Sequence, residues 1–155
     1  PDWEKTFDQN DPKFSGGLKK SAETWSNDGN AQGNIISSLD EKDIARGHIY
    51  CSSWPSVFIG AYADHVRIVR ILPRGSEKIE LVSEWLFKEE TLQDKNYKLS
   101  NVVDFASKVM EQDAKACELN QEGIYAQSFE EGILMPEEYL LKRFHDWVRS
   151  KVKIN

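Results

Sequence analysis

Apolar and polar residues alternate through the middle of the chain, a pattern typical of β-strands. The clearest case is residues 66–72, where one face would carry Val66, Ile68, Arg70 and Leu72, and the other Arg67, Val69 and Ile71. Residues 49–51 and 57–62 are rich in β-branched and aromatic types, and residues 79–87 alternate again after a turn at 73–76. The short connections between these segments predict an antiparallel meander rather than a βαβ unit.

Beyond residue 100 the apolar positions recur at helical spacing. Ser100 can cap a helix that begins at Asn101, and Gly123 is expected to end it. Pro136 suits the first turn of a last helix, whose apolar stripe would consist of Leu140, Leu141, Phe144, Trp147, Val148 and Val152. A short helix is also expected to start within residues 38–43. The sequence therefore predicts an α+β fold, with an antiparallel sheet and two C-terminal helices that pack on it.

The first thirty-odd residues are polar and rich in turn-forming residues, which predicts loops around at most one short strand, residues 18–25. This irregular stretch contains four aromatic residues, Trp3, Phe7, Phe14 and Trp25. Aromatic side chains in irregular segments usually need a surface to pack against. We therefore expect these loops to lie on the chain's own sheet or on structure that the chain does not contain.

Length and composition narrow the class of protein. The 155 residues suit one domain, residues 1–155, with a hydrophobic core of its own. The net charge of -6, without a basic stripe, makes nucleic acid an unexpected partner. No apolar run is long enough to span a membrane, and residues 1–5 lack the features of a signal peptide.

The cysteines and histidines do not form a metal-binding pattern. Cys51 and Cys117 are far apart, which excludes a disulfide framework and a zinc or iron–sulfur site built from this chain alone. Two such cysteines fit a reducing cytoplasm, and we expect each to be a small buried residue. His48, His65 and His145 show no spacing typical of metal ligands.

One acidic residue stands out on the helix that follows Ser100. Asp113 falls on the same helical face as the apolar residues Val102, Ala106, Val109, Met110 and Cys117. A carboxylate directed into an apolar face must be hydrogen-bonded, paired with a cation or bound to a metal. Helical geometry leaves these options open, including contact with water or a pair with Arg67 or Arg70.

The segment 110–124 resembles a stretch in the α subunits of Rieske-type non-haem iron oxygenases, the aromatic-ring-hydroxylating dioxygenases and their relatives. In that family an acid-rich helix supplies the carboxylate of a 2-His-1-carboxylate iron site. Other segments resemble family features and occur in the family's order along the chain: the turn 24–29, the strand segments 55–59, 64–66 and 84–87, and the closing helix 144–148. The resemblance covers residues 14–152 and is strongest to the branch of glycine-betaine and choline monooxygenases.

This resemblance implies a helix-grip (START/Bet v1-like) catalytic domain, incomplete in this chain, that holds mononuclear Fe(II). Asp113 takes the place of the carboxylate ligand, while Phe105, Ala106 and Val109 would line a substrate pocket unless they are plain core residues. The family's cluster motifs, C-x-H and C-x-x-H, and its N-x-x-D-x-x-H-x-x-x-x-H segment do not occur here. We therefore expect the two histidine ligands and a 2Fe–2S cluster in a preceding segment, and we expect this chain alone to be inactive.

The resemblance implies a function for the full-length protein as the terminal oxygenase component, a mono- or dioxygenase. It would use O2 to hydroxylate or oxidatively demethylate a small aromatic or quaternary-amine substrate. Electrons would come from NAD(P)H through a separate reductase or ferredoxin, and the full-length protein would be a homotrimer. Two alternatives remain: a non-catalytic helix-grip domain that binds a small ligand, and a protein-interaction domain that uses the N-terminal aromatic residues. A desolvated Asp113 would favour the oxygenase.

Overall fold

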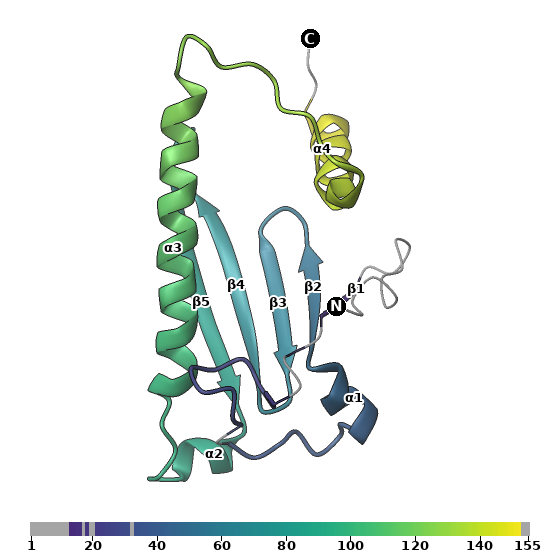
Figure 1. Cartoon of the computed structure of the whole chain (residues 1–155), viewed down its shortest axis with the longest axis vertical. Helices are drawn as coiled ribbons and strands as arrows, with labels where there is room; N and C mark the ends of the chain where they lie inside the picture. The colour runs from purple at the N-terminus through teal and green to yellow at the C-terminus, as the bar shows by residue number, and fades with distance from the viewer. Residues whose placement is uncertain (1–12, 17, 19–20, 32, 153–155) are drawn as a thin grey trace. The chain divides into compact units, whose positions relative to one another are not determined.

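The computed structural model describes residues 13–16, 18, 21–31 and 33–152 (Figure 1). The chain divides into two compact units, residues 1–111 and 112–155, which are described separately below. The first unit contains the sheet, two short helices and the start of a long helix. In the described part of the chain, no helix is long and apolar enough to cross a bilayer.

The first unit is built on an antiparallel sheet in which each strand pairs with its neighbour in sequence. The α+β class and the antiparallel meander predicted from the alternation are therefore confirmed. In sheet order, the five strands are β1 (Lys13–Gly16), β2 (His48–Ser53), β3 (Val57–Tyr62), β4 (His65–Pro73) and β5 (Ile79–Phe87).

The tight turn between β3 and β4 gathers aromatic and polar side chains at one end of the sheet. The turn consists of Ala63 and Asp64, both buried. His65 follows directly and pairs with Phe87 on β5, while Tyr62 pairs with His48 on β2. Because side chains on a strand alternate between faces, the face that carries His65 also carries the pair Arg67 and Trp85.

Three helices accompany the sheet in sequence: α1 (Glu41–Arg46), α2 (Glu89–Gln93) and α3 (Ser100–Ile124). The short helix predicted near residues 38–43 is α1, and Asp40 caps it by accepting a 2.8 Å hydrogen bond from the backbone N–H of Asp43. The bounds expected for α3 are correct to within one residue. Sequence analysis did not predict α2, because five residues are too few to show a helical period.

The predicted strand at residues 18–25 is wrong over its described part, residues 18 and 21–25, none of which lies in a strand. The backbone N–H groups of Glu23 and Thr24 donate to the carbonyl of Gly29 at 2.7 and 3.2 Å, so this backbone closes a loop instead of pairing with a strand. The strand that does join the sheet is β1, earlier in the chain. Trp3 and Phe7, and the side chain of Phe14, lie outside the described residues.

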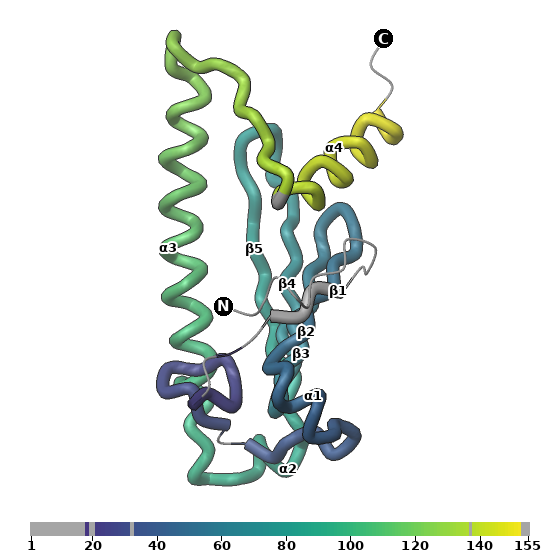
Figure 2. The backbone as a smooth tube through the Cα atoms, turned by 45° about the vertical axis from the view of Figure 1, so that its right-hand side comes forward, coloured from purple at the N-terminus to yellow at the C-terminus, as the bar shows by residue number. Residues whose placement is uncertain are grey.

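Trp25 connects α3 to the sheet within the first unit. Its indole stacks on Tyr62 of β3, with ring centroids 5.8 Å apart, and meets the edge of Phe105 on α3 at 4.9 Å. The guanidinium of Arg67 lies 5.3 Å from the same indole. In Figure 2 the loop that carries Trp25 passes beside the start of α3. This loop therefore fills the space between helix and sheet, as expected for an aromatic residue in an irregular segment.

The second unit contains the end of α3, a 3-10 turn (Pro136–Glu138) and α4 (Tyr139–Lys151). The last helix was predicted to begin at Pro136, and the structure makes its first turn a 3-10 turn. Glu138 accepts a 2.8 Å hydrogen bond from the backbone N–H of Met135 and so caps this turn. None of the residues of α4 is buried. That α4 packs on the sheet stays a prediction.

Gly47 provides a test of the packing between α1 and the N-terminal loop. It ends α1 with a φ of 91°, and a Cβ there would lie 2.9 Å from Leu18 Cγ and 3.0 Å from the Leu18 backbone nitrogen. Gly75 has a φ of 105° and nothing within 4 Å. We expect Gly75→Ala to lower the free energy of unfolding by about 1–2 kcal/mol through backbone strain alone. Gly47→Ala should cost a further ~1–3 kcal/mol from overpacking, as measured by urea unfolding. Equal losses in the two variants would contradict this packing.

Candidate functional site

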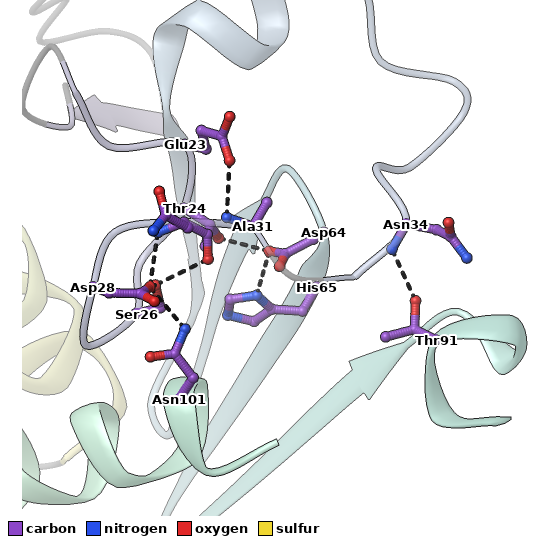
Figure 3. A network of polar contacts seen from close by, with 11 residues as sticks. Glu23, Thr24, Ser26, Asp28, Ala31, Asn34, Asp64, His65, Thr91 and Asn101 are labelled. Carbon is purple, nitrogen blue, oxygen red and sulfur yellow. Dashed lines mark hydrogen bonds and ion pairs between the residues drawn. The ribbon is translucent and has the colours of Figure 1, made fainter. Parts of the chain in front are cut away.

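A buried polar network lies where the β3–β4 turn meets the N-terminal loop (Figure 3). Thr24 donates a 2.6 Å hydrogen bond to Asp64 Oδ1, and His65 Nδ1 lies 2.8 Å from the same oxygen. The side chains of Asp64 and His65 are fully buried, and Thr24 is only 1% exposed. A carboxyl group this deeply buried is tolerated because its Oδ1 has two hydrogen-bond partners.

Aromatic rings surround this network. The ring of Tyr62 stacks on His65 with centroids 4.6 Å apart, and Phe87 lies 5.5 Å from the imidazole on another side. Tyr62 also shares a 2.9 Å hydrogen bond with Tyr50, and burial, followed by this bond, raises the pKa of Tyr62. The Tyr62 hydroxyl therefore stays protonated, and the aromatic shell keeps water away from the Asp64–His65 pair.

His48 lies at the edge of the same aromatic group. Its ring is 4.6 Å from Tyr50 and 5.9 Å from Tyr62, and burial lowers its pKa. A histidine with a lowered pKa is neutral over most of the physiological range, and a neutral imidazole can accept a proton or a hydrogen bond. His145, in contrast, is exposed on α4, as expected for a surface residue.

A second set of hydrogen bonds ties the N-terminal loop to the start of α3. Asp28 Oδ1 accepts from the Asn101 side-chain amide and from the Asn30 backbone N–H, both at 2.9 Å. The Asn27 backbone N–H donates to the Asn101 carbonyl at 2.9 Å. The Asn101 amide, followed by the Asn30 N–H, holds the pKa of Asp28 at about 2.

This clamp predicts a specific response to acid. Because the pKa of Asp28 falls from 3.8 to about 2 on folding, the stabilisation is present above the higher value and is lost as the pH falls through the lower one. We expect Asp28→Asn to flatten the dependence of stability on pH in that window. Asn101→Ala, which removes the principal donor, should flatten it similarly, as followed by chemical denaturation at a series of pH values. A profile unchanged in both variants would rule out the clamp.

The three residues predicted to line a substrate pocket lie on the part of α3 that belongs to the first unit. Ala106 is fully buried, while Phe105 and Val109 are half-buried. Phe105 makes its aromatic contact with Trp25. The structure therefore brings Phe105 to the loop that bears Thr24, and the role of the three residues in a pocket stays a prediction.

Asp113 is exposed, so of the options that helical geometry left open the described chain shows contact with water, and the desolvated carboxylate that would favour the oxygenase is not observed. All ten residues from Glu111 to Asn120 are exposed, because no described side chain shields this stretch of helix. The two arginines considered as partners of Asp113 contact other residues. Arg67 donates to Ser83 Oγ at 2.9 Å, and Arg70 pairs with Glu84 at 2.8 Å. Asp113 therefore has an accessible carboxylate, and its role as a metal ligand stays a prediction.

Cys51 and Cys117 are both exposed free thiols, so the expectation that they are buried is wrong. Cys117 lies in the same uncovered stretch of α3 as Asp113, where a helical stripe in the sequence does not lead to burial. Cys51 lies on β2 at a position that its neighbours do not cover.

The described residues do not contain a complete metal site, since no three His, Cys, Asp or Glu side chains among them are placed to share an ion. His65 is engaged with Asp64, and His48 is half-buried among tyrosine rings. The described residues therefore do not bring together a complete donor set for a 2-His-1-carboxylate iron.

Comparison with known proteins decides the family. The ring hydroxylating alpha subunit family, in its catalytic domain, matches residues 4–154. The chain belongs to this family. Choline monooxygenase, chloroplastic, from Spinacia oleracea is 26% identical over 105 residues, which is 67% of this chain and 24% of the relative. The chain therefore spans about a quarter of the length of this relative. The family membership predicted from segment 110–124 and the motifs around it is confirmed.

In this member of the ring hydroxylating alpha subunit family, the turn 24–29 makes side-chain contacts that sequence analysis did not predict. Thr24 binds Asp64, Trp25 bridges β3 and α3, and Asp28 clamps Asn101. Sequence analysis found the turn only through family resemblance. The signal that could have identified its role is the density of hydrogen-bonding side chains around Trp25, since such residues fold loops onto neighbouring elements.

Proposed function

We propose that this chain is the C-terminal part of the catalytic domain of a terminal oxygenase, in which Asp113 supplies the carboxylate of a mononuclear Fe(II) site. Two histidines from another part of the intact protein would complete the ligand set. The observation that carries this proposal is the family match over residues 4–154, which includes α3 and Asp113. When bound, Fe(II) with such ligands supplies the activation of O2.

The carboxylate of Asp113 is accessible and not desolvated, so the assignment rests on the family match and not on burial of this residue. Among the described residues it has no hydrogen-bond or ion-pair partner, so no contact within the chain competes with a metal for its oxygens. Lys115, two residues away, pairs with Glu118 at 3.8 Å. Segments that bring histidines to this face of α3 would also cover it, and burial would strengthen the interaction between ligand and metal.

The first unit supports the role of a scaffold that holds α3 in place. Trp25 separates α3 from the sheet, and Asp28 fixes its first residues. We include in the proposal a helix-grip arrangement in which Phe105, Ala106 and Val109 line the substrate pocket. These side chains would exclude water from the reacting centre, and their apolar character suits a small organic substrate.

The substrate class that we favour is a quaternary amine, with hydroxylation or oxidative demethylation as the reaction. The similarity to choline monooxygenase supports this choice over an aromatic substrate. The proposal also includes a 2Fe–2S cluster elsewhere in the intact protein, an electron supply from NAD(P)H through a reductase or ferredoxin, a homotrimeric assembly and a cytoplasmic location. The two exposed thiols of this chain fit a reducing compartment.

The proposal is tested with the intact protein that carries this chain, supplied with a reductase, NAD(P)H and 18O-labelled O2. We expect label from O2 to appear in the product of a quaternary amine, with O2 uptake proportional to product. An aromatic acid serves as the comparison substrate. If only the aromatic acid gives product, the substrate class is aromatic and not a quaternary amine. Uptake of O2 without labelled product from either class would contradict the function.

A further inference from the structure

β5 is the last strand of the described sheet, at the end opposite β1 (Figure 1). It is nine residues long, Ile79–Phe87, and among the described strands it pairs with β4 alone. The outer edge of such a strand presents a row of backbone N–H and C=O groups, which is a ready template for pairing with another strand. We therefore asked which groups this edge presents and what could cover them.

Two hydrogen bonds fix which backbone groups of β5 face outward. In an antiparallel pair, successive residues of a strand alternate between bonding to the neighbour on one side and facing the other side. The Ile71 N–H donates to the Ser56 carbonyl at 2.9 Å, so Ile71 faces β3 and the residues on either side of it face β5. The bond from the Arg74 N–H to the Lys78 carbonyl, 2.8 Å long, gives the same alternation. Given the register of β4 and β5, the outward-facing groups of β5 belong to Ile79, Leu81, Ser83, Trp85 and Phe87.

The edge is uncovered within the described part of the chain. The outward backbone groups of these five residues make no hydrogen bond to another described residue. No residue of β5 is buried, and apolar side chains are exposed on both faces of the strand. Ile79 and Leu81 are 61% and 42% exposed on one face, and Leu86 is 54% exposed on the other. A neighbouring strand would satisfy the backbone groups and remove this apolar surface from water.

β5 also lacks the devices that normally prevent edge-to-edge pairing, such as prolines, bulges, unpaired charges or a short strand. It contains no proline, and its register with β4 is continuous over all nine residues, so no bulge interrupts it. Its two acidic residues are paired with arginines, Glu80 with Arg74 and Glu84 with Arg70. The sequence of β5 therefore favours a strand that is paired on both sides.

We propose that the outer edge of β5 is an interaction surface that pairs with an extended segment of the same intact protein, from outside residues 1–155. This inference rests on the proposed function in one respect, namely that the chain is part of a larger catalytic domain. The match covers 24% of choline monooxygenase, so most of a protein of that length is available to supply the strand.

The edge defines the kind of segment that fits it. Backbone hydrogen bonds would hold the added strand, and its side chains would set the register. On one face the strand would lie beside the exposed Ile79 and Leu81 and the half-buried Trp85, which favours apolar residues at alternate positions. On the other face it would lie beside Glu80 and Glu84, which favours basic or hydroxyl residues between them. A segment of about five residues, a common strand length, would span the outward groups from Leu81 to Trp85.

Amide hydrogen exchange in the intact protein, resolved to single residues and corrected for intrinsic exchange rates, tests the pairing without any variant. The inward-facing amides of Glu80, Val82 and Glu84 bond to β4 and are matched controls within the same strand. If the edge is paired, the outward-facing amides of Leu81 and Trp85 should exchange within about tenfold of these controls. On an open edge they should exchange more than about a hundredfold faster, and that result would overturn the proposal.

A crystal or cryo-electron microscopy structure of the intact protein identifies the source of the strand. We expect an extended segment of the same chain with backbone hydrogen bonds to Leu81, Ser83 and Trp85. Solvent or a helix against this edge would contradict the proposal, and so would a strand from a second copy. Neither measurement involves iron, O2 or substrate. Labelled product without a paired strand would therefore refute this inference alone, and a paired strand without labelled product would refute the proposed function alone.

Discussion

Replacement of Asp113 by alanine in the intact protein should abolish retention of mononuclear iron and turnover, while the absorbance of the 2Fe–2S cluster is preserved. Substitution of residues that only support a metal ligand typically costs 10–100-fold in affinity or activity, so loss of a ligand itself should exceed about 100-fold. Iron content by mass spectrometry, cluster absorbance and product formation measure the three quantities separately.

Glu111→Ala is the matched control for this experiment, because Glu111 is an exposed acid on the same helix, two residues earlier. We expect it to keep its iron and its turnover. Normal iron content and turnover in Asp113→Ala would remove the ligand assignment. A parallel loss in both variants would show that the effect comes from the charge or stability of α3 and not from coordination.

Substitution of Asp64 by alanine should produce the largest loss of stability in the first unit. Its side chain is fully buried and Oδ1 binds both Thr24 and His65, so removal of the carboxylate leaves two buried groups without their partner. Removal of one member of a buried pair typically costs ~3–5 kcal/mol. Urea unfolding followed by tryptophan fluorescence should report the change, because Trp25 stacks on Tyr62 beside the network.

Asp64→Asn separates hydrogen bonding from charge, since the amide oxygen can still accept from both donors. We expect Asp64→Asn to lower the free energy of unfolding less than Asp64→Ala does. Asp104→Ala, at an exposed position on α3, should change the free energy of unfolding by no more than about 0.5 kcal/mol. A similarly small change in Asp64→Ala would mean that the network contributes nothing to folding.

The strands were predictable because alternation reports directly on which side of a sheet a residue faces. β4 and β5 were predicted from alternating and near-alternating positions, within a few residues of their observed bounds. The loop at residues 21–31 was not predictable in the same way, because it is shaped by contacts with Asp64 and Asn101, far away in sequence. Local patterns contain no information on such partners.

At the candidate site, too, local sequence patterns did not identify the contacts between residues that the fold brings together. A helical stripe predicted that Asp113 and Cys117 face a core, but a stripe becomes buried only where another element covers it, and both residues are exposed. The sequence showed only that His65 lacks the spacing of a metal ligand, and the structure places it fully buried against Asp64. Family resemblance pointed to Asp113, whereas the Asp64–His65 pair required coordinates.

The indole of Trp25 acts as a spacer whose thickness sets the gap between the first turns of α3 and Tyr62 on β3. A smaller side chain at this position would let the helix approach the strands, and a different loop conformation would tilt it, with the sequence of helix and strands unchanged. In this architecture, the width of any cavity beneath α3 can therefore be adjusted by changes in a short segment that belongs to neither wall.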